Sequence, residues 1–429
     1  MRYTPINQSF YKKNRDKLAK ALEPRSLVIL HSNDLMPTNA DGTMKFRQNN
    51  DLFYLCGIDQ EDTILLMCPD FPNEGMREIL FVKETNEHIA IWEGNKLSKA
   101  AATEISGVKH IRWSSEYGTV LQQLMGYCNH ILLHTNEHRG AHNAVETRNT
   151  RYNKKVKDAF PLHNYERLAP IMERLRSVKE QDEIDQIQRA CDITEKGFRR
   201  VLDFVKPGVR EYEIEAEFMH EFLRNGSRGF AYEPIIGSGK NSCVLHYLEN
   251  NQLCNSGELI LMDVGAEYGN YNADMTRTIP VNGRFTPRQK SVYEAVLRVK
   301  REAVSMLRPG VLIQEYQKEV GKIMESELIE LRLLDKMDIK RQDPSNPLYR
   351  KYFMHGTSHH LGLDVHDVGS VFEPVEEGMV FTVEPGIYIR EEGIGVRLEN
   401  DYVIGKDKNL DLMKNIPIEV EEIEALMNY

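Results

Sequence analysis

Two pairs of acidic residues in the second half of the 429-residue chain are the first candidates for chemistry. In the stretch LILMDVGAEYGNYNADMTRT, Asp263 and Asp274 flank Tyr268 and Gly269, where the glycine suits a tight turn. If Tyr268 and Gly269 form a two-residue turn, Asp263 lies directly opposite Asp274, and like charges so placed destabilise a sheet. The pair therefore predicts a divalent cation between carboxylates, which such cations prefer as ligands. The alternative is that both aspartates lie at exposed loop ends.

A second acidic pair occurs in FTVEPGIYIREEGIGVRLEND. Glu384 and Glu399 stand on either side of a charged bend at Glu391, Glu392 and Gly393. Their odd separation, centred on a turn, lets the two glutamates face each other across a second hairpin. Buried pairs of like charge are hard to explain without a metal, and four carboxylates suit two cations that share oxygen ligands.

Between the two predicted hairpins lies FMHGTSHHLGLDVHDVG, which holds His355, His359, His360 and His366. Imidazole is a common metal ligand and the usual proton-transfer group near neutral pH. A single histidine in such a run is more often structural, but four beside two acidic pairs indicate a functional site. No cysteines stand at zinc-finger spacing, and the HEXXH pattern is absent.

The elements that must position these residues include a repeat. VKPGVREYE at Val205 and LRPGVLIQE at Leu307 each place a Pro-Gly-Val turn between two helical patterns. A helix, this turn, a second helix and then strands, run twice, predict two similar halves around a shared cleft. The alternative is that Pro-Gly-Val is a common helix stop, with glycine ending an unrelated helix in each case.

The first part of the chain follows a different pattern. An amphipathic helix from Phe10 to Leu22 precedes four short apolar runs, SLVIL, TILLM, EILFV and HILLH, and this pattern is typical of an α/β domain. From Val178 the spacing of apolar residues changes to that of one long helix. We therefore expect an α/β domain over residues 1–175 and a catalytic domain over residues 176–429.

Composition and charge narrow the function. The net charge is −10 and no long run of Lys or Arg occurs, which argues against nucleic acid as a partner. No apolar stretch approaches the roughly 20 residues that cross a bilayer, and the start lacks the apolar middle of a signal peptide. The six cysteines are scattered without a CxxC pair, which favours reduced thiols. We expect no membrane partner and a cytoplasmic location.

The ordered set of Asp263, Asp274, His359, Glu384 and Glu399 resembles the metal-binding set of the pita-bread metallopeptidases, the family of methionine aminopeptidase, prolidase and aminopeptidase P. The resemblance is strongest to the aminopeptidase P group, through GSGKNSCVLHYLEN, HGTSHHLGLDVHDVG, VEPGIYI, GIGVRLEND and, in the first domain, FRQNNDLFYLCG. It implies an α/β N-terminal domain followed by an α+β pita-bread catalytic domain with an internal pseudo-twofold repeat. It also implies removal of the first residue from peptides whose second residue is proline.

The resemblance further implies two divalent cations per subunit, with manganese expected and cobalt, iron and zinc left open. Asp263 would chelate one cation, Asp274 and Glu399 would bridge both, and His359 and Glu384 would complete the other site. Water activated by the cations would attack the carbonyl before proline, and Glu384 would carry a proton towards the leaving nitrogen.

Other site residues are implied in the same way. His366 would stabilise the oxyanion, His246 and His355 would line the substrate pocket and assist the reaction, and Arg397 would support the metal site. For Tyr388, a role in the site and a packed hairpin aromatic both stay open. Trp92 matches a first-domain tryptophan that reaches a neighbouring subunit's site, although it would also suit a core. The first domain would then serve oligomerisation and substrate gating in a homodimer or homotetramer.

Two positions depart from the family pattern. The acidic run that usually follows the last ligand is Asn400 and Asp401, and His360 stands where tryptophan is frequent. Three alternatives stay open: a prolidase that takes only dipeptides, a non-catalytic peptide-binding or protein-binding relative, and a metal-free creatinase-type hydrolase. The complete ligand set argues against the last two, and RQNNDLFYLCG favours aminopeptidase P over prolidase.

Overall fold

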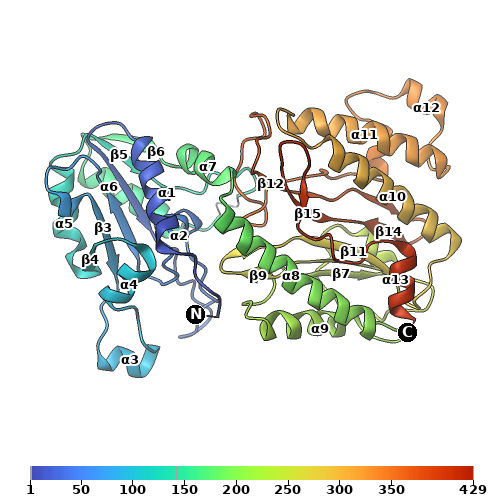
Figure 1. The fold of residues 1–429 in the computed structure, drawn as a ribbon, viewed down its shortest axis with the longest axis horizontal. Coiled ribbons are helices and arrows are strands. Elements are labelled where there is room, and N and C mark those ends of the chain that lie inside the picture. Colours follow the sequence, from blue (N-terminus) through green and yellow to red (C-terminus); the bar gives the residue numbers. More distant parts are fainter. Residues whose placement is uncertain (1, 142–143, 429) are drawn as a thin grey trace. The chain divides into compact units, whose positions relative to one another are not determined.

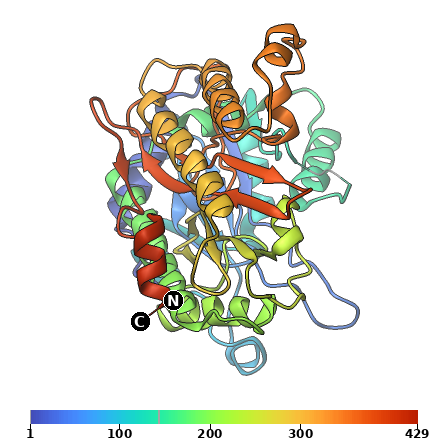
Figure 2. The same cartoon turned by 90° about the vertical axis from the view of Figure 1, so that its right-hand side faces the viewer.

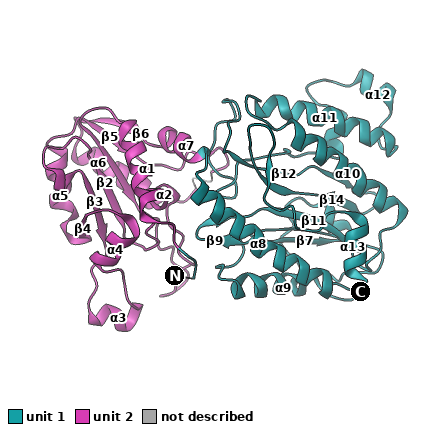
Figure 3. Ribbon diagram, viewed as in Figure 1, with its two compact units in different colours: residues 1–4, 177–429 teal, residues 5–176 magenta. Residues whose placement is uncertain are grey.

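The computed structural model describes residues 2–141 and 144–428. The chain forms two compact units, one of residues 5–176 and one of residues 177–429 together with residues 1–4 (Figures 1 and 3). Each unit has its own sheets and helices, and each is described by itself below.

The N-terminal unit is built on one six-stranded mixed sheet in the order β4-β3-β2-β1-β5-β6 (Figure 1). The four apolar runs of the sequence are its central strands, as predicted, and these strands are almost completely buried. The edge strands β4 and β6 are largely half-buried or exposed and carry no apolar run, so their sequences gave no strand signal. The strands are β1 Ser26–His31, β2 Ile64–Met67, β3 Glu78–Val82, β4 His110–Trp113, β5 His130–Leu133 and β6 Asn164–Arg167.

Helices flank this sheet. The predicted amphipathic helix is α1, which begins after Asn7, whose side chain caps it by accepting a hydrogen bond from the backbone N–H of Ser9. All six cysteines of the chain are buried and none is in a disulfide in this structure, and the sulfurs of Cys68 and Cys128 lie 3.3 Å apart. The helices are α1 Gln8–Lys20, α2 Asn50–Cys56, α3 Glu87–Glu93, α4 Lys99–Ser106, α5 Tyr117–Met125, α6 Arg148–Ala159 and α7 Ala169–Ser177.

The C-terminal unit contains the predicted repeat. In both Pro-Gly-Val turns the glycine has a positive φ and its N–H donates to a distant carbonyl, that of Cys254 for Gly208 and that of Val375 for Gly310. In both, the N–H of that distant residue donates back to the carbonyl of the turn's valine. This shared bonding pattern confirms two similar halves over unrelated helix stops. The paired helices are α8 Gln181–Phe204 with α9 Glu211–Arg224, and α10 Pro287–Met306 with α11 Ile313–Glu330.

The strands of this unit form short antiparallel sheets, and the helices lie on the outside of these sheets (Figure 2). Helix α8 contacts β9 and β10, whereas α10 contacts β12, β13 and β14. The strands of the first half are β7 Ile235–Ser238, β8 Leu259–Val264, β9 Glu267–Tyr268, β10 Tyr271–Asn272 and β11 Met275–Pro280. Those of the second are β12 Val380–Val383, β13 Gly386–Ile389, β14 Ile394–Arg397, β15 Asn400–Val403 and β16 Leu410–Asp411, and the remaining helices are α12 Lys336–Arg341 and α13 Val420–Met427. Within the described ranges, no helix combines the length and apolar character needed to cross a bilayer.

Candidate metal centre

The first acidic pair lies on one hairpin, but its register differs from the prediction. Asp263 pairs with Thr276 in β8 and β11, not with Asp274. The central residues of the turn are Gly269 and Asn270, both at positive φ, and not Tyr268 and Gly269. A turn of this kind needs two residues that tolerate the left-handed region, and asparagine does so where tyrosine does not. The prediction of direct opposition is therefore wrong, and the two aspartates lie diagonally across the hairpin.

The second acidic pair lies as predicted. Val383 pairs with Asn400 in β12 and β15, and Gly386 pairs with Arg397 in β13 and β14. Both pairings keep one register, which puts Glu384 opposite Glu399 in the gap between them. The two halves of the molecule thus each carry one pair of carboxylates on paired chain segments, with Asp263 inside β8 and the other three just beyond strand ends.

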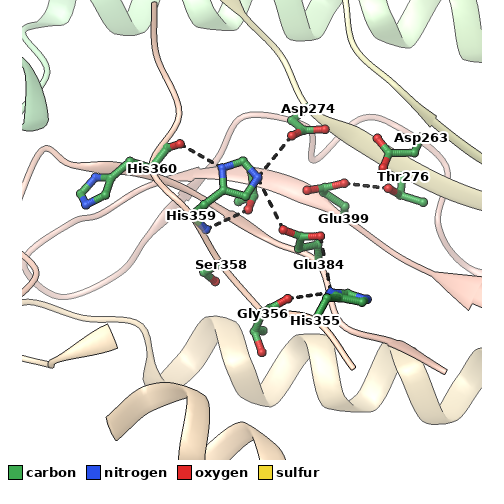
Figure 4. Close-up of polar contacts among 12 residues, drawn as sticks. Asp263, Asp274, Thr276, His355, Gly356, Ser358, His359, His360, Glu384 and Glu399 are labelled. Carbon is green, nitrogen blue, oxygen red and sulfur yellow. Dashed lines mark hydrogen bonds and ion pairs between the residues drawn. The ribbon is translucent and has the colours of Figure 1, made fainter. Parts of the chain in front are cut away.

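These carboxylates converge on one histidine. Ligand atoms of Asp274, His359 and Glu399 all lie within 4.8 Å of one another. Nε2 of His359 lies 3.4 Å from Oδ2 of Asp274 and 3.5 Å from Oε1 of Glu384 (Figure 4). Asp263 joins the group through Tyr232, whose hydroxyl lies 2.5 Å from Oδ1 of Asp263 and 2.6 Å from Oδ1 of Asp274.

The electrostatics of this group call for positive charge. Burial raises the pKa of Asp274 and Glu399, and it raises the pKa of Glu384 to about 7. Burial alone would lower the pKa of His359, but hydrogen bonding and attraction from Asp274 and Glu384 outweigh it and raise that pKa to about 9. One buried oxygen, Oε1 of Glu399, has no hydrogen-bond partner. Oxygen-rich donors with one imidazole and an unused carboxylate oxygen fit divalent cations.

A chain of hydrogen bonds connects this group to His355. Arg397 donates to Oδ2 of Asp263 at 2.5 Å, to Oγ1 of Thr276 at 3.1 Å and to the Tyr388 hydroxyl at 2.8 Å. That hydroxyl lies 2.7 Å from Nε2 of His355, whose Nδ1 lies 2.7 Å from the carbonyl oxygen of Gly356. Tyr388 is buried, but its hydroxyl belongs to this polar chain, so it is more than a packed aromatic. Burial and then Arg397 lower the pKa of His355 to about 3, which keeps its ring neutral.

Three other predicted residues are His366 and His246, in the same unit as this centre, and Trp92, in the other unit. The exposed ring of His366 packs on the ring of His359, with 4.1 Å between centroids. His246 is exposed, and its charge is one of the smaller influences that lower the pKa of His355. Trp92 lies in the other unit, on α3, and 78% of it is exposed, so it is not a core residue.

His360, one of the two departures from the family pattern, does not join the carboxylates. Its ring packs on Phe381 with 4.2 Å between centroids, and in Figure 4 it points away from the acidic group. Burial and then Lys179 lower its pKa to about 3. It is therefore a neutral packing residue.

Two residues of the centre were absent from the sequence prediction. Thr276, whose hydroxyl donates to Oε2 of Glu399 at 2.7 Å, follows Asp274 by two positions in the chain. Strand alternation puts such residues on one face, so this signal was present in the sequence. Tyr232 lies between α9 and β7 with no local pattern that marks it, and only the fold reveals its position.

Comparisons with known proteins agree with this geometry. A family model described as metallopeptidase family M24 matches residues 185–406, and one described as aminopeptidase P, N-terminal domain, matches residues 11–133. The chain is 34% identical to the Xaa-Pro aminopeptidase of Escherichia coli strain K12, with 98% of both chains covered. It is 30% identical to Xaa-Pro aminopeptidase 3 of Homo sapiens, with 98% of this chain and 86% of the human protein covered.

Solved structures give the same result. The aminopeptidase PepP of Pseudomonas aeruginosa is 28% identical, with a TM-score of 0.90 over 99% of this chain and 98% of that one. A zinc-substituted E. coli aminopeptidase P in complex with product is 33% identical, with a TM-score of 0.88 over 99% of both chains. The chain therefore belongs to metallopeptidase family M24 and, within it, to the Xaa-Pro aminopeptidases.

Proposed function

We propose that this enzyme releases the first residue from peptides with proline in second position, at a centre for two divalent cations. The observation that supports this proposal is that ligand atoms of Asp274, His359 and Glu399 lie within 4.8 Å of one another, with Glu384 3.5 Å from His359. Proline makes a dedicated site necessary, because its nitrogen carries no hydrogen and its ring fixes the backbone, so general peptidase clefts bind it badly.

We assign the ligands as Asp263, Asp274, His359, Glu384 and Glu399. Manganese is the proposed cation, because a donor set of four carboxylates and one imidazole suits it. When bound, two such cations lower the pKa of water and polarise the carbonyl of the scissile bond. The Tyr232 hydroxyl contacts one oxygen of Asp263 and one of Asp274, and Arg397 binds the other oxygen of Asp263, so both aspartates are held in place.

Glu384 is the proposed proton carrier. Its carboxylate lies 3.5 Å from Nε2 of His359, beside the proposed cations, where it can take a proton from water and give it to the leaving proline nitrogen. His355, whose Nδ1 lies 3.8 Å from Oε2 of Glu384, is less suited to that task, because its nitrogens each lie 2.7 Å from another partner, Gly356 or Tyr388, and its ring stays neutral. We assign it to the wall of the substrate pocket with His246. The exposed imidazole of His366 beside His359 is the proposed donor to the oxyanion.

The N-terminal unit is the proposed oligomerisation and gating domain. Ile91 and Trp92 on α3 are 79% and 78% exposed, and α3 has no buried residue. Large exposed apolar side chains on one short helix suit a contact with a second copy of the chain, in a homodimer or homotetramer. A reducing compartment such as the cytoplasm is proposed from the six free thiols.

The test is hydrolysis of an Xaa-Pro-Yaa tripeptide and the matching Xaa-Pro dipeptide by metal-stripped enzyme, before and after manganese is added. Manganese-dependent release of Xaa from the tripeptide is expected. Cleavage of the dipeptide alone would identify a prolidase. Failure to cleave either peptide with manganese, cobalt, iron or zinc would favour a peptide-binding relative, a reading that the retained ligand set disfavours.

A further inference from the structure

Thr382 and Asp401 form a directly opposed pair in β12 and β15. They lie two residues from Glu384 and Glu399, so strand alternation puts both pairs on one face. Asp401 is completely buried, and its Oδ2 accepts a hydrogen bond from the backbone N–H of Asp274 at 3.0 Å. On the other strand, Oγ1 of Thr382 accepts one from the backbone N–H of His359 at 3.3 Å. A polar pair next to the two glutamates thus fixes the backbone of two further ligands.

The two halves of the molecule exchange this support. Thr276 follows Asp274 by two residues, and its hydroxyl donates to Oε2 of Glu399. Asp401 follows Glu399 by two residues and accepts from the N–H of Asp274. The residue two positions beyond each of these ligands therefore holds the ligand of the other half. Each half of the internal repeat thus supplies one group that holds a proposed ligand of the other half.

The neighbour of Asp401 has a different role. Asn400 lies next to it on β15, and its Nδ2 donates to both carboxylate oxygens of Asp411 at 2.9 Å. An acidic residue at position 400 would instead face the Asp411 carboxylate with like charge. Only Asp401 of the two contacts a ligand of the metal centre.

We propose that Asp401 is a positioning residue for cation binding, which acts by holding the backbone of Asp274. The inference rests on the proposed assignment of Asp274 as a metal ligand. Oδ2 of Asp401 accepts hydrogen bonds from two donors, the backbone N–H of Asp274 and, at 3.5 Å, the thiol of Cys191. Removal of this acceptor would free the Asp274 segment and leave a buried N–H without a partner.

The test is calorimetric titration of metal-stripped full-length protein with manganese, in wild type, Asp401→Ala, Asp401→Asn, Asp274→Ala and Asn400→Ala. Substitution of groups that orient ligands typically costs about 10–100-fold in metal affinity, and this loss is expected for Asp401→Ala. Asp401→Asn keeps an acceptor oxygen on the same side-chain frame, so a smaller, few-fold loss is expected. Asn400→Ala, the matched control, should lose stability through its freed Asp411 carboxylate yet bind manganese as wild type does.

The outcomes separate this inference from the proposed function. If Asp274→Ala loses manganese binding while both Asp401 variants bind as wild type does, the centre is correct and the positioning role is overturned. If Asp274→Ala itself binds two cations with unchanged affinity, the proposed centre fails, and the inference fails with it. If Asp401→Ala does not fold, Asp401→Asn decides alone, and wild-type affinity in that variant overturns the proposal.

Discussion

The hydroxyl of Tyr388 lies 2.7 Å from Nε2 of His355, and Arg397 donates to the same hydroxyl. The carbonyl of Gly356 can only accept, so Nδ1 of His355 carries the ring hydrogen that it binds. Nε2 of the neutral ring is then the acceptor for the proton of the Tyr388 hydroxyl. The orientation of the His355 ring is therefore set by a phenol that is itself held by the guanidinium bound to Asp263. The proposed substrate pocket and the proposed metal centre thus share one hydrogen-bond chain.

Tyr388→Phe should lower kcat/KM by about 10–100-fold, because it breaks the chain that orients both the pocket residue His355 and the guanidinium of Arg397 without removing a metal ligand. Steady-state kinetics on an Xaa-Pro-Yaa tripeptide at saturating manganese measure it. Tyr293→Phe is the matched control, since that buried hydroxyl donates to the carbonyl of Ile418. The control should lose about 1 kcal/mol of stability and no activity. Equal kinetics in the two variants would show that the Tyr388 hydroxyl does not support catalysis.

The two hairpins show how far the sequence predicts this centre. Glu384 and Glu399 are in the predicted register because their turn lies at the charged bend from which it was inferred. The first hairpin is displaced because the left-handed residues are Gly269 and Asn270, a distinction that depends on asparagine's tolerance of positive φ. The turn is displaced by one residue, which shifts the partner of Asp263 by two residues, from Asp274 to Thr276, so Asp263 and Asp274 keep a common face.

Contacts between distant segments were not predictable. Tyr232 comes from a loop, and its hydroxyl reaches both aspartates only because α9 and β7 fix that loop beside the hairpin. The edge strands β4 and β6 were missed for another reason: exposed strands need no apolar run. Local pattern thus predicts the buried strands and the acidic and histidine residues that the fold brings together, whereas the residues that orient them depend on tertiary packing.

Gly265 offers a test of the corrected register. A Cβ at this position would lie 1.8 Å from the carbonyl oxygen of Ala273, the residue before Asp274. Gly265→Ala should therefore force the hairpin strands apart and destabilise the protein by about 1–3 kcal/mol. It should also weaken manganese binding. Gly118→Ala, on α5 where the added Cβ meets no atom within 4 Å apart from its own helix backbone and chain neighbours, should be neutral or stabilising. Denaturant unfolding and metal titration check both variants, and wild-type behaviour of Gly265→Ala would contradict the register.

His31 should make the stability depend on pH. Burial and then Arg148 lower its pKa from 6.5 to about 3, and its ring packs 4.1 Å from that of Tyr152. The unfolded chain takes up a proton near pH 6.5 and the folded chain only near pH 3, so acid favours unfolding between these values. The contribution is about 1.4 kcal/mol per pH unit. In denaturant unfolding between pH 7 and 5, His31→Phe should show a shallower decline than wild type. The exposed control His138→Gln should keep the wild-type slope.

Trp92 tests whether the N-terminal unit completes the enzyme in an oligomer. With 78% of Trp92 exposed, Trp92→Ala should change the free energy of unfolding by no more than about 0.5 kcal/mol. If the side chain contacts a second copy of the chain, the variant should form smaller assemblies in sedimentation and lose kcat/KM at concentrations where wild type is assembled. Leu162→Ala, which removes an even more exposed apolar residue of the same unit, is the control and should change neither. Unchanged assembly and unchanged kcat/KM in Trp92→Ala would show that Trp92 does not contribute to a neighbouring subunit's active site. Peptide binding would then need only the residues of the subunit that cleaves the peptide.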